Sequence, residues 1–339
     1  INSITDRSGY CGPVISGVST NNSTGCMIIP AGPTEHRGGR GRGIIAGGRN
    51  HPLTLSTIDM IEIGTLGNAT DFGDLAQQNS GASGGASSTT RAVLAGGYEN
   101  PGLTSRLQFV IMSSSGGAVN FGNLVNGVNG GIGCGSNNIR GIFYGGNNPE
   151  YVPFLSHINL QSLGTDSDFG STLVAQRNAA CAQSGTRAVF AGGDASTGNL
   201  FTIQSIEFAT LGTPTSFGQL TDDRTGHTAV SSGTRGVFAG GKAPGVVDTM
   251  EYITIATEGN GTDFGDLSVA KRNMSGNNNS VRGTFAGGNL AASGSGSNTN
   301  VIEYITIATT GNAQDFGDLT VIRRCANSGG SDAHGGLVR

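Results

Sequence analysis

Residues 282–288 read Arg-Gly-Thr-Phe-Ala-Gly-Gly, and residues 302–320 read Ile-Glu-Tyr-Ile-Thr-Ile-Ala-Thr-Thr-Gly-Asn-Ala-Gln-Asp-Phe-Gly-Asp-Leu-Thr. Both phrases recur along the 339-residue chain, and self-similarity at a fixed period indicates a repeat architecture. Copies of the first phrase follow one another at intervals of 49, 49, 47, 48 and 47 residues, beginning at Arg42, Arg91, Arg140, Arg187, Arg235 and Arg282. Copies of the second phrase are centred on Phe72, Phe121, Phe169, Phe217, Phe264 and Phe316. An apolar segment begins fourteen residues before each of these Phe residues, so the spacing within the repeat is the same in all six copies.

Each unit contains short segments with the composition of β-strands. Residues 282–288 and 301–307 are rich in β-branched and aromatic residues and are bounded by Gly and Asn, a pattern typical of strands. Thr-Gly-Asn at 310–312 supplies residues that tolerate positive φ, as tight turns between strands require. With a further strand before each Arg, as at 272–279, a unit of about 48 residues predicts a four-stranded propeller blade.

Small residues recur six positions before the repeated Arg, where the innermost strand of a blade would crowd around the propeller axis. They are Gly85, Cys134, Cys181, Ala229, Gly276 and, six positions before His334, Ser328. The segment 324–338 therefore places His334 in the Arg position, with residues 335–338 expected to begin the next strand, and residues 1–5 match 302–306. We predict an all-β fold in which residues 1–339 form one seven-bladed β-propeller of four-stranded antiparallel blades. Its last blade is expected to combine about 320–339 with 1–20, so that N- and C-terminal strands close the ring.

Composition and charge exclude several classes of protein. The 60 Gly residues and only 12% charged residues rule out long helices and a coiled coil. A formal net charge of −4 offers no attraction to phosphate backbones, so no nucleic-acid partner is expected. Residues 107–139 carry no charge but are full of Gly, Ser and Asn, which are costly in hydrocarbon, so no membrane insertion is expected. Because the sequence starts at Ile1 without Met, we expect a processed chain or a piece of a longer polypeptide.

One unit carries residues in the order found in kelch repeats. Residues 224–227 read Arg-Thr-Gly-His, residues 234–241 read Thr-Arg-Gly-Val-Phe-Ala-Gly-Gly, and residues 250–252 read Met-Glu-Tyr. This order resembles the kelch repeat, although only this unit has the His, and Phe stands where the family has Trp. The wording of residues 302–320 more specifically resembles Gly-rich repeats in virion structural and tail-fibre proteins of marine bacteriophages, cyanophages above all. The resemblance covers almost the whole chain and supplies no catalytic residue.

This resemblance implies a non-enzymatic virion structural protein that acts in host attachment or tail-fibre adhesion. The implied location is the virion, or a secreted or cell-surface location if the protein is not viral. The implied partners are other virion proteins and a host-surface glycan or receptor, with several copies in the particle and no cofactor. Two alternatives stay open: a passive decoration or assembly protein of the virion, and a cellular kelch-like module that binds protein or glycan.

Two sequence motifs that have known functions in other proteins are interpreted here as structural. Asp-Phe-Gly at Asp71, Asp263 and Asp315 matches a kinase magnesium motif, but a kinase uses that motif once and needs a Lys strand and a His-Arg-Asp loop. We therefore expect the Phe to pack between blades and the Gly to allow the backbone to bend. The Gly-Arg run at 38–43 has no helical pattern after it, so we expect a solvated turn rather than a phosphate loop.

The six repeated Arg residues, with His334 as a seventh member, would form a ring of charge. Such a ring can bind an anion. The favoured interpretation is structural: each guanidinium, with five donors, bonds to carbonyls or to the Asp of a Phe-Gly phrase and joins strands or adjacent blades.

No metal or catalytic site is expected from Cys, His and the acidic residues. Cys11, Cys26, Cys134, Cys181 and Cys325 include no Cys-x-x-Cys pair. Cys134 and Cys181 hold the same repeat position and are expected to be buried thiols, whereas Cys11 and Cys26 are open to pairing. The five His residues are scattered over different units, and most acidic residues sit at repeat positions. A copper oxidase or a glycosidase is therefore disfavoured.

The segments after each Gly-Gly are the variable part of the repeat. They span 49–57, 98–106, 147–154, 194–202, 242–249 and 289–300. We expect them on one face of the propeller, where variable loops on a rigid frame carry recognition, with a plain solvated rim as the alternative. The residues predicted to contact a ligand there are Arg49, His51, Tyr98, Glu99, Tyr151 and Lys242.

Overall fold

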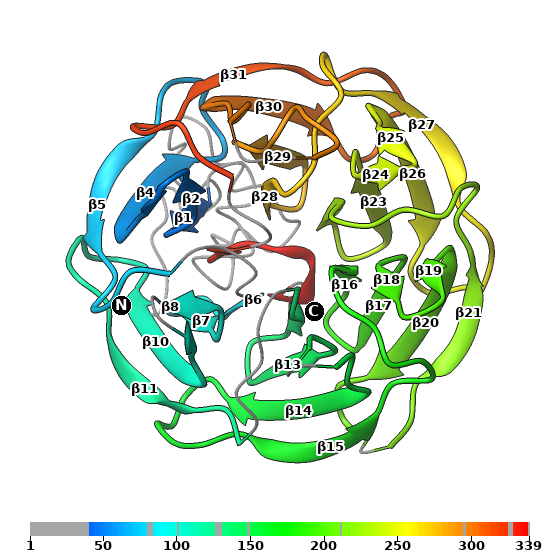
Figure 1. Cartoon of the computed structure of the whole chain (residues 1–339), viewed down its shortest axis with the longest axis horizontal. Coiled ribbons are helices and arrows are strands. Elements are labelled where there is room, and N and C mark those ends of the chain that lie inside the picture. Colours follow the sequence, from blue (N-terminus) through cyan, green and yellow to red (C-terminus); the bar gives the residue numbers. More distant parts are fainter. Residues whose placement is uncertain are drawn as a thin grey trace, which may run out of the picture.

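The computed structural model describes residues 41–79, 84–99, 102–125, 131–147, 150–210, 212–293, 296–324 and 328–337. Within these residues the chain forms six antiparallel sheets of four strands each, arranged around a common axis as the blades of a propeller (Figure 1). The predicted all-β propeller with four-stranded antiparallel blades is confirmed. The predicted number of seven blades is wrong, because the described residues form six.

Each sheet extends outward from an innermost strand beside the axis to an outermost strand at the rim. In this order, the first sheet contains β32 (Gly329–Ser331), β1 (Arg42–Ala46), β4 (Thr57–Glu62) and β5 (Thr70–Asp74). The second contains β6 (Gly84–Ser87), β7 (Arg91–Ala95), β10 (Arg106–Ile111) and β11 (Val119–Asn123). The third contains β12 (Gly133–Ser136), β13 (Arg140–Tyr144), β14 (Phe154–Asn159) and β15 (Ser167–Ser171). The fourth contains β16 (Ala180–Gln183), β17 (Arg187–Ala191), β20 (Thr202–Glu207) and β21 (Thr215–Gln219). The fifth contains β22 (Thr228–Ser231), β23 (Arg235–Ala239), β26 (Thr249–Thr254) and β27 (Thr262–Asp266). The sixth contains β28 (Ser275–Asn278), β29 (Arg282–Ala286), β30 (Val301–Thr306) and β31 (Gln314–Asp318).

The first sheet combines strands from distant parts of the chain, and this explains the error in the blade count. Strand β32 pairs directly with β1, with Gly329 opposite Ile45 and Ser331 opposite Gly43. Strand β32 is therefore the innermost strand of the first sheet, whose second strand begins at Arg42. It completes this sheet and does not begin a seventh one. Residues 335–337 form a 3-10 turn, not the strand expected after His334. The predicted pairing of residues 1–5 lies outside the described residues.

The small residues predicted for the innermost strands lie there, with one shift of register. Gly85 pairs with Leu94, three positions after Arg91. In the first sheet the residue three positions after the repeated Arg is Ile45. It pairs with Gly329 and not with the predicted Ser328, which precedes β32. A Cβ added to Gly85 would collide with the carbonyl oxygen of Gly329, so neighbouring innermost strands require glycine at this close approach.

Short hairpins follow four of the six Gly-Gly pairs. They are β2 (Arg49–Asn50) with β3 (Leu53–Thr54), β8 (Tyr98–Glu99) with β9 (Gly102–Leu103), β18 (Asp194–Ala195) with β19 (Gly198–Asn199), and β24 (Lys242–Ala243) with β25 (Gly245–Val246). In the other two sheets a single bridge closes the segment, between Asn147 and Tyr151 and between Asn289 and Asn298. The variable segments therefore share a folded-back form.

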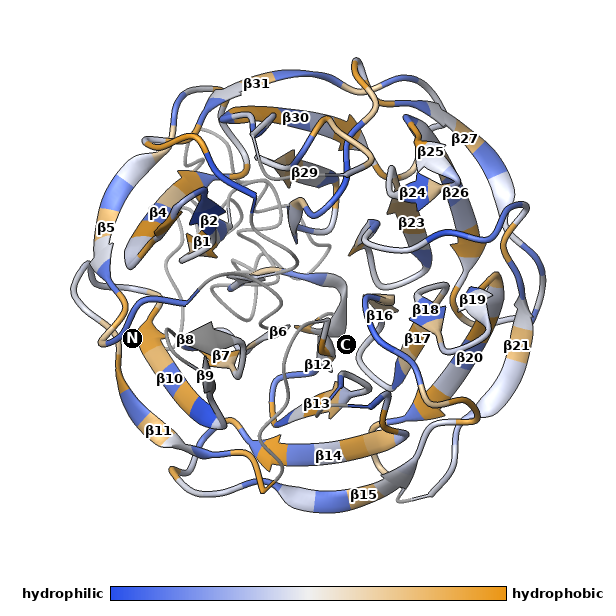
Figure 2. Cartoon of the chain, in the orientation of Figure 1, coloured by the Kyte–Doolittle hydropathy of each residue, from blue (hydrophilic) through white to orange (hydrophobic). Residues whose placement is uncertain are grey.

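Each pair of neighbouring sheets encloses an apolar layer built around one repeated Phe. The pairing of the third and fourth strands shifts register in all six sheets, as between Ile58 and Asp59, and the extra residue of the outer strand is the Phe. Phe72 packs with Leu94, Val110 and Met112 of the second sheet, and its equivalents pack in the same way. Figure 2 shows apolar residues concentrated in the second and third strands of the sheets, such as β23 and β30. Burial between sheets thus supplies the core.

The Gly after each repeated Phe lets the backbones of neighbouring sheets approach. Gly73 has φ +146°, and a Cβ there would lie 2.5 Å from the carbonyl oxygen of Gly116. The carbonyl of Phe72 accepts a hydrogen bond from the N–H of Gly116 at 2.8 Å. The same bond joins Phe121 to Gly164, Phe169 to Gly212, Phe217 to Gly259, Phe264 to Gly311 and Phe316 to Gly67. Asp-Phe-Gly is therefore an element of packing between sheets.

We predict that Phe264→Ala lowers the free energy of unfolding by about 3–5 kcal/mol, because it leaves a cavity in the layer between the fifth and sixth sheets. Phe264 is only 2% exposed. Urea denaturation and the Tm measure the loss. Val269→Ala is the control, since Val269 is 51% exposed and its truncation should change stability by less than about 0.5 kcal/mol. Similar losses for both variants would contradict the packing role.

Candidate functional site

The direction of the strands gives the propeller two distinct faces. Each second strand runs from its repeated Arg to its Gly-Gly pair, as β17 does from Arg187 to Ala191. We call the face that carries the segments after Gly-Gly the loop face. The opposite face carries the turns before each repeated Arg, such as residues 184–186, and is called the turn face.

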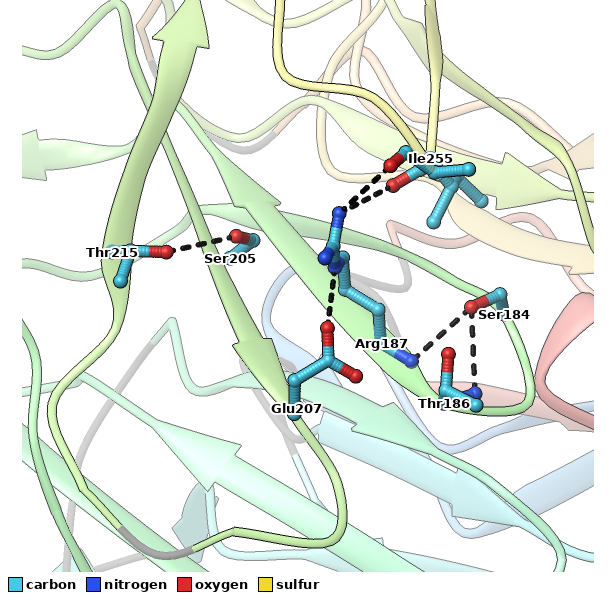
Figure 3. Close-up of polar contacts among 8 residues, drawn as sticks. Ser184, Thr186, Arg187, Ser205, Glu207, Thr215 and Ile255 are labelled. Atoms are coloured by element: carbon cyan, nitrogen blue, oxygen red, sulfur yellow. Dashed lines mark hydrogen bonds and ion pairs between the residues drawn. The ribbon is translucent and has the colours of Figure 1, made fainter.

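On the turn face, each repeated Arg donates to a carbonyl of the next sheet. Arg187 donates through Nη1 to the carbonyls of Ile255 and Ala256 at 3.2 Å and through Nε to Glu207 at 2.7 Å (Figure 3). The equivalent bonds run from Arg42 to Met112, Arg91 to Leu160, Arg140 to Phe208, Arg235 to Ile307 and Arg282 to Ile63. The guanidinium groups of Arg91, Arg140, Arg235 and Arg282 also lie over aromatic rings. These contacts join each sheet to the next, and the carboxylate partners are Glu62 and Glu207 rather than the Asp of the Phe-Gly phrases.

His334 lies on the propeller axis and not in the ring of Arg residues. Its Nε2 lies 2.8 Å from the carbonyl oxygen of Ser87, and Gln183 Nε2 lies 2.8 Å from its Nδ1. The amide nitrogen of Gln183 can only donate, so Nδ1 is the acceptor and Nε2 carries the proton. Burial lowers the pKa of His334 to about 4, which keeps the ring neutral at ordinary pH.

The space on the axis is polar and small. The last residues of the innermost strands are linked around it by hydrogen bonds, as between Ser87 and Ser136 at 2.9 Å and between Ser331 and Asn278 at 2.7 Å. The cavity they leave measures about 50 Å³, far below the range of about 300–1,000 Å³ for ligand pockets. Cys134 and Cys181 line it as free thiols, and burial raises the pKa of both. Among the described residues, the space on the axis is therefore too small for a sugar-sized ligand.

We predict that His334 makes the stability of the protein fall as the pH falls below its ordinary pKa of 6.5. Between this value and its folded pKa of about 4, the unfolded chain binds a proton that the folded chain does not, which costs about 1.4 kcal/mol per pH unit. Thermal unfolding at about pH 7 and about pH 5 measures the effect. His334→Gln should lose less Tm than the natural chain over this range. Exposed His51→Gln is the control, and equal losses for both variants would contradict the assignment.

The segments that cross from one sheet to the next are anchored by buried ion pairs near the loop face. Lys271 Nζ lies 2.5 Å from Glu303 Oε2, and both side chains are almost fully buried. Arg323 pairs in the same way with Asp59, and Arg224 with Glu251. Glu303 Oε1 also accepts the N–H of Ser268 at 2.8 Å. Sequence reasoning missed these pairs, although three units share a pattern for them. In each, a basic residue lies a few positions before the innermost strand, and an acidic residue is the third residue of the third strand.

The fourth sheet performs the same anchoring without charge, and this suggests a matched experiment. There Gln204 Nε2 donates to Gln176 Oε1 at 3.3 Å, and Gln204 Oε1 accepts the N–H of Leu173. We predict that Glu303→Ala costs about 3–5 kcal/mol, because it leaves the Lys271 ammonium buried without its partner. Lys271→Gln combined with Glu303→Gln copies the neutral pair and should recover most of that loss in urea denaturation. A double variant as unstable as Glu303→Ala would contradict this account.

The loop-face residues predicted to contact a ligand have different surroundings. Arg49 is half-buried and pairs with Arg324 in a β-bridge, and its Nη2 lies 3.0 Å from Nδ1 of exposed His51. Lys242 is half-buried, and its backbone bridges to Thr225. Tyr98 and Glu99 form β8, but their side chains lie outside the described residues. The structure thus brings Arg49 and His51 together and separates both from Lys242 and Tyr151, which lie on other sheets.

Tyr151 belongs to a polar cluster centred on Asp194. Its hydroxyl donates to Asp194 Oδ2 at 2.8 Å, and the Arg177 guanidinium lies over its ring and 3.0 Å from the same oxygen. Asn178 and Thr225 donate to Asp194 Oδ1. Burial by itself would raise the pKa of Asp194, but the hydrogen bonds and the charge of Arg177 outweigh it and hold the pKa below its usual value. This cluster joins segments of three sheets.

A second cavity lies on the turn face. It measures about 630 Å³ and is lined by the turns 137–139 and 184–186 together with Arg187, Ile255 and Leu337. Its size falls in the range of ligand pockets. Sequence reasoning did not anticipate it, because the C-terminal 3-10 turn contributes one wall.

Comparison with known proteins adds no family. No protein-family model matches this sequence, and no curated protein matches it. No helix in the described ranges is long and apolar enough to cross a membrane. Among the described residues no three His, Cys, Asp or Glu side chains gather as a metal-binding group. What the structure establishes is the β-propeller itself, an arrangement consistent with a kelch-like repeat fold.

Proposed function

We propose that this chain is a non-enzymatic recognition propeller that attaches through its loop face to a host-surface glycan or receptor, as a structural protein of a phage virion. The observation that carries the proposal is the residue directly after each Gly-Gly pair. This residue occupies the same place in the repeat but differs in chemistry from sheet to sheet. It is Arg49, Tyr98, Asn147, Asp194, Lys242 and Asn289 in the six units.

The rest of the repeat has little freedom to vary. The repeated Phe and Gly are used in packing between sheets, and the repeated Arg is used in hydrogen bonds to the next sheet. Variation there costs stability, whereas the segments after Gly-Gly differ in length and in side chains between sheets that keep the same four-stranded form. A rigid frame that presents different side chains at one face is typical of recognition proteins.

The assignment to a phage virion is supported by the resemblance of the repeat sequence, as in residues 302–320, to Gly-rich repeats of phage structural proteins. In a particle, several copies of the chain would act together with other virion proteins. Contacts between hydroxyl, charged or aromatic groups and a sugar contribute on the order of 1 kcal/mol each, so multiple copies raise the effective affinity. Exposed Phe201, beside β20, adds an aromatic surface at the loop face, with 42% of its area accessible.

Passive assembly in the virion is the second candidate, and the turn face favours it. The cavity of about 630 Å³ lies there. Ile139 and Leu163 are more than 60% exposed, and Val281 is 51% exposed. Exposed aliphatic side chains of this kind are suited to burial against a neighbouring subunit.

One experiment separates the two candidates. We expect Tyr98→Ala combined with Tyr151→Ala to weaken binding of the labelled protein to marine bacterial cells and to a panel of surface polysaccharides by about tenfold or more. Ile139→Ser combined with Val281→Ser is the matched turn-face control and should bind normally. Thermal unfolding verifies that both variants are folded. Binding that is unchanged in the loop-face variant and lost in the turn-face variant would overturn the proposal in favour of assembly.

A further inference from the structure

Three Arg side chains come together on the loop face where the sixth and first sheets meet. The N–H and carbonyl groups of Arg49 and Arg324 bond to each other at 3.0 and 3.1 Å. Asn298 Nδ2 donates to the carbonyl of Arg49 at 3.1 Å, and Asn298 bridges to Asn289. Asn289 in turn bridges to Arg272. Arg272, Arg49 and Arg324 are therefore connected by a continuous series of backbone bridges and one side-chain hydrogen bond.

The fourth sheet shows what this position looks like when its charge is balanced. There the bridge joins Arg177 to Asp194, and the two side chains form an ion pair at 3.0 Å. Arg177 corresponds to Arg324, and Asp194 corresponds to Arg49. The first sheet thus has the same backbone bridge with the carboxylate replaced by a second guanidinium.

Nothing in the described part of the chain neutralises the three charges. The neighbouring Lys271 and Arg323 are paired with Glu303 and Asp59 in the buried anchors, but none of the three Arg residues forms an ion pair with a described carboxylate. Arg49 Nε is buried without a hydrogen-bond partner. Burial lowers the pKa of Arg324, and the nearby positive charges of Arg49 and Arg272 lower it further, so these charges repel that of Arg324.

Repulsion of this kind is relieved by an anion. A guanidinium binds the two oxygens of a carboxylate, sulfate or phosphate side by side. All three side chains are half-buried, so they are partly desolvated and still accessible from the loop face. Their positive charge is local, because the whole chain has a net charge of −4.

We infer that Arg49, Arg272 and Arg324 form a binding site for an oxyanion, and that the ligand of the loop face is an acidic polysaccharide carrying sulfate or carboxylate groups. The second part rests on the function proposed above and narrows it to one class of glycan. A long nucleic acid fits less well, because its phosphates would extend past three charges onto a negatively charged protein.

The fourth sheet provides the decisive variant. Arg49→Asp recreates the Arg–Asp pair of that sheet, so it should remove anion binding while leaving the chain folded. Arg106→Gln is the matched control, because Arg106 begins β10 near the loop face of another sheet and its replacement also removes one positive charge. Thermal unfolding without added anion verifies that both variants are folded.

Inorganic sulfate tests the site without any glycan. At constant ionic strength, sulfate in place of chloride should raise the Tm of the natural chain and of Arg106→Gln, but not that of Arg49→Asp. An equal rise in all three proteins would overturn the site.

Dextran sulfate, polygalacturonate and neutral dextran test the ligand class on immobilised protein. We expect the first two to bind at least about tenfold more tightly than dextran, and Arg49→Asp to abolish that preference. Sulfate binding without any preference for the acidic polysaccharides would retain the anion site but overturn the assigned ligand. Single-stranded DNA that binds as tightly as the acidic polysaccharides would overturn it as well.

Discussion

The contact on which the rest of the structure depends is the one between the Phe-Gly phrase of each outer strand and the turn of the next sheet. The register shift before Gly73 directs Phe72 into the apolar layer, and the missing Cβ lets the carbonyl of Phe72 accept the N–H of Gly116. A four-stranded sheet by itself leaves apolar surface in water. Burying that surface against a neighbour, while satisfying the backbone at the same point, stabilises the arrangement of sheets.

The remaining contacts between sheets divide the molecule into parts with different tolerance for change. On the turn face, guanidinium groups such as that of Arg187 bond to carbonyls of the next sheet. In the crossing segments, buried pairs such as Lys271 with Glu303 hold the chain at the entrance to each sheet. Both sets use side chains whose loss would leave buried polar groups without partners. The segments after Gly-Gly make such contacts in some sheets, as Asp194 does in the fourth, and their chemistry differs from sheet to sheet.

The charged side chains also differ between the frame of the propeller and its loop face. The buried cations are balanced one by one, and Asp194 is surrounded by four donors from three sheets. Arg49 and Arg324 share a backbone bridge of the same geometry without such a balance. Because the frame is identical at both places, the difference lies in side-chain chemistry alone. This is the arrangement expected where a repeat has kept its fold and changed its surface.

The sequence by itself determined the repeat, the strands and the packing role of the Phe, because these depend on spacing and composition within one unit. Tertiary structure decided the number of blades. His334 follows a small residue by six positions, as the repeated Arg residues do, but pairing of β32 with β1 joins segments almost 290 residues apart, with Ser331 opposite Gly43. Tertiary structure also decided which loop residues meet. Tyr151 contacts Asp194, and Arg49 contacts Arg324, because neighbouring sheets bring them together across distances along the chain that no local pattern encodes.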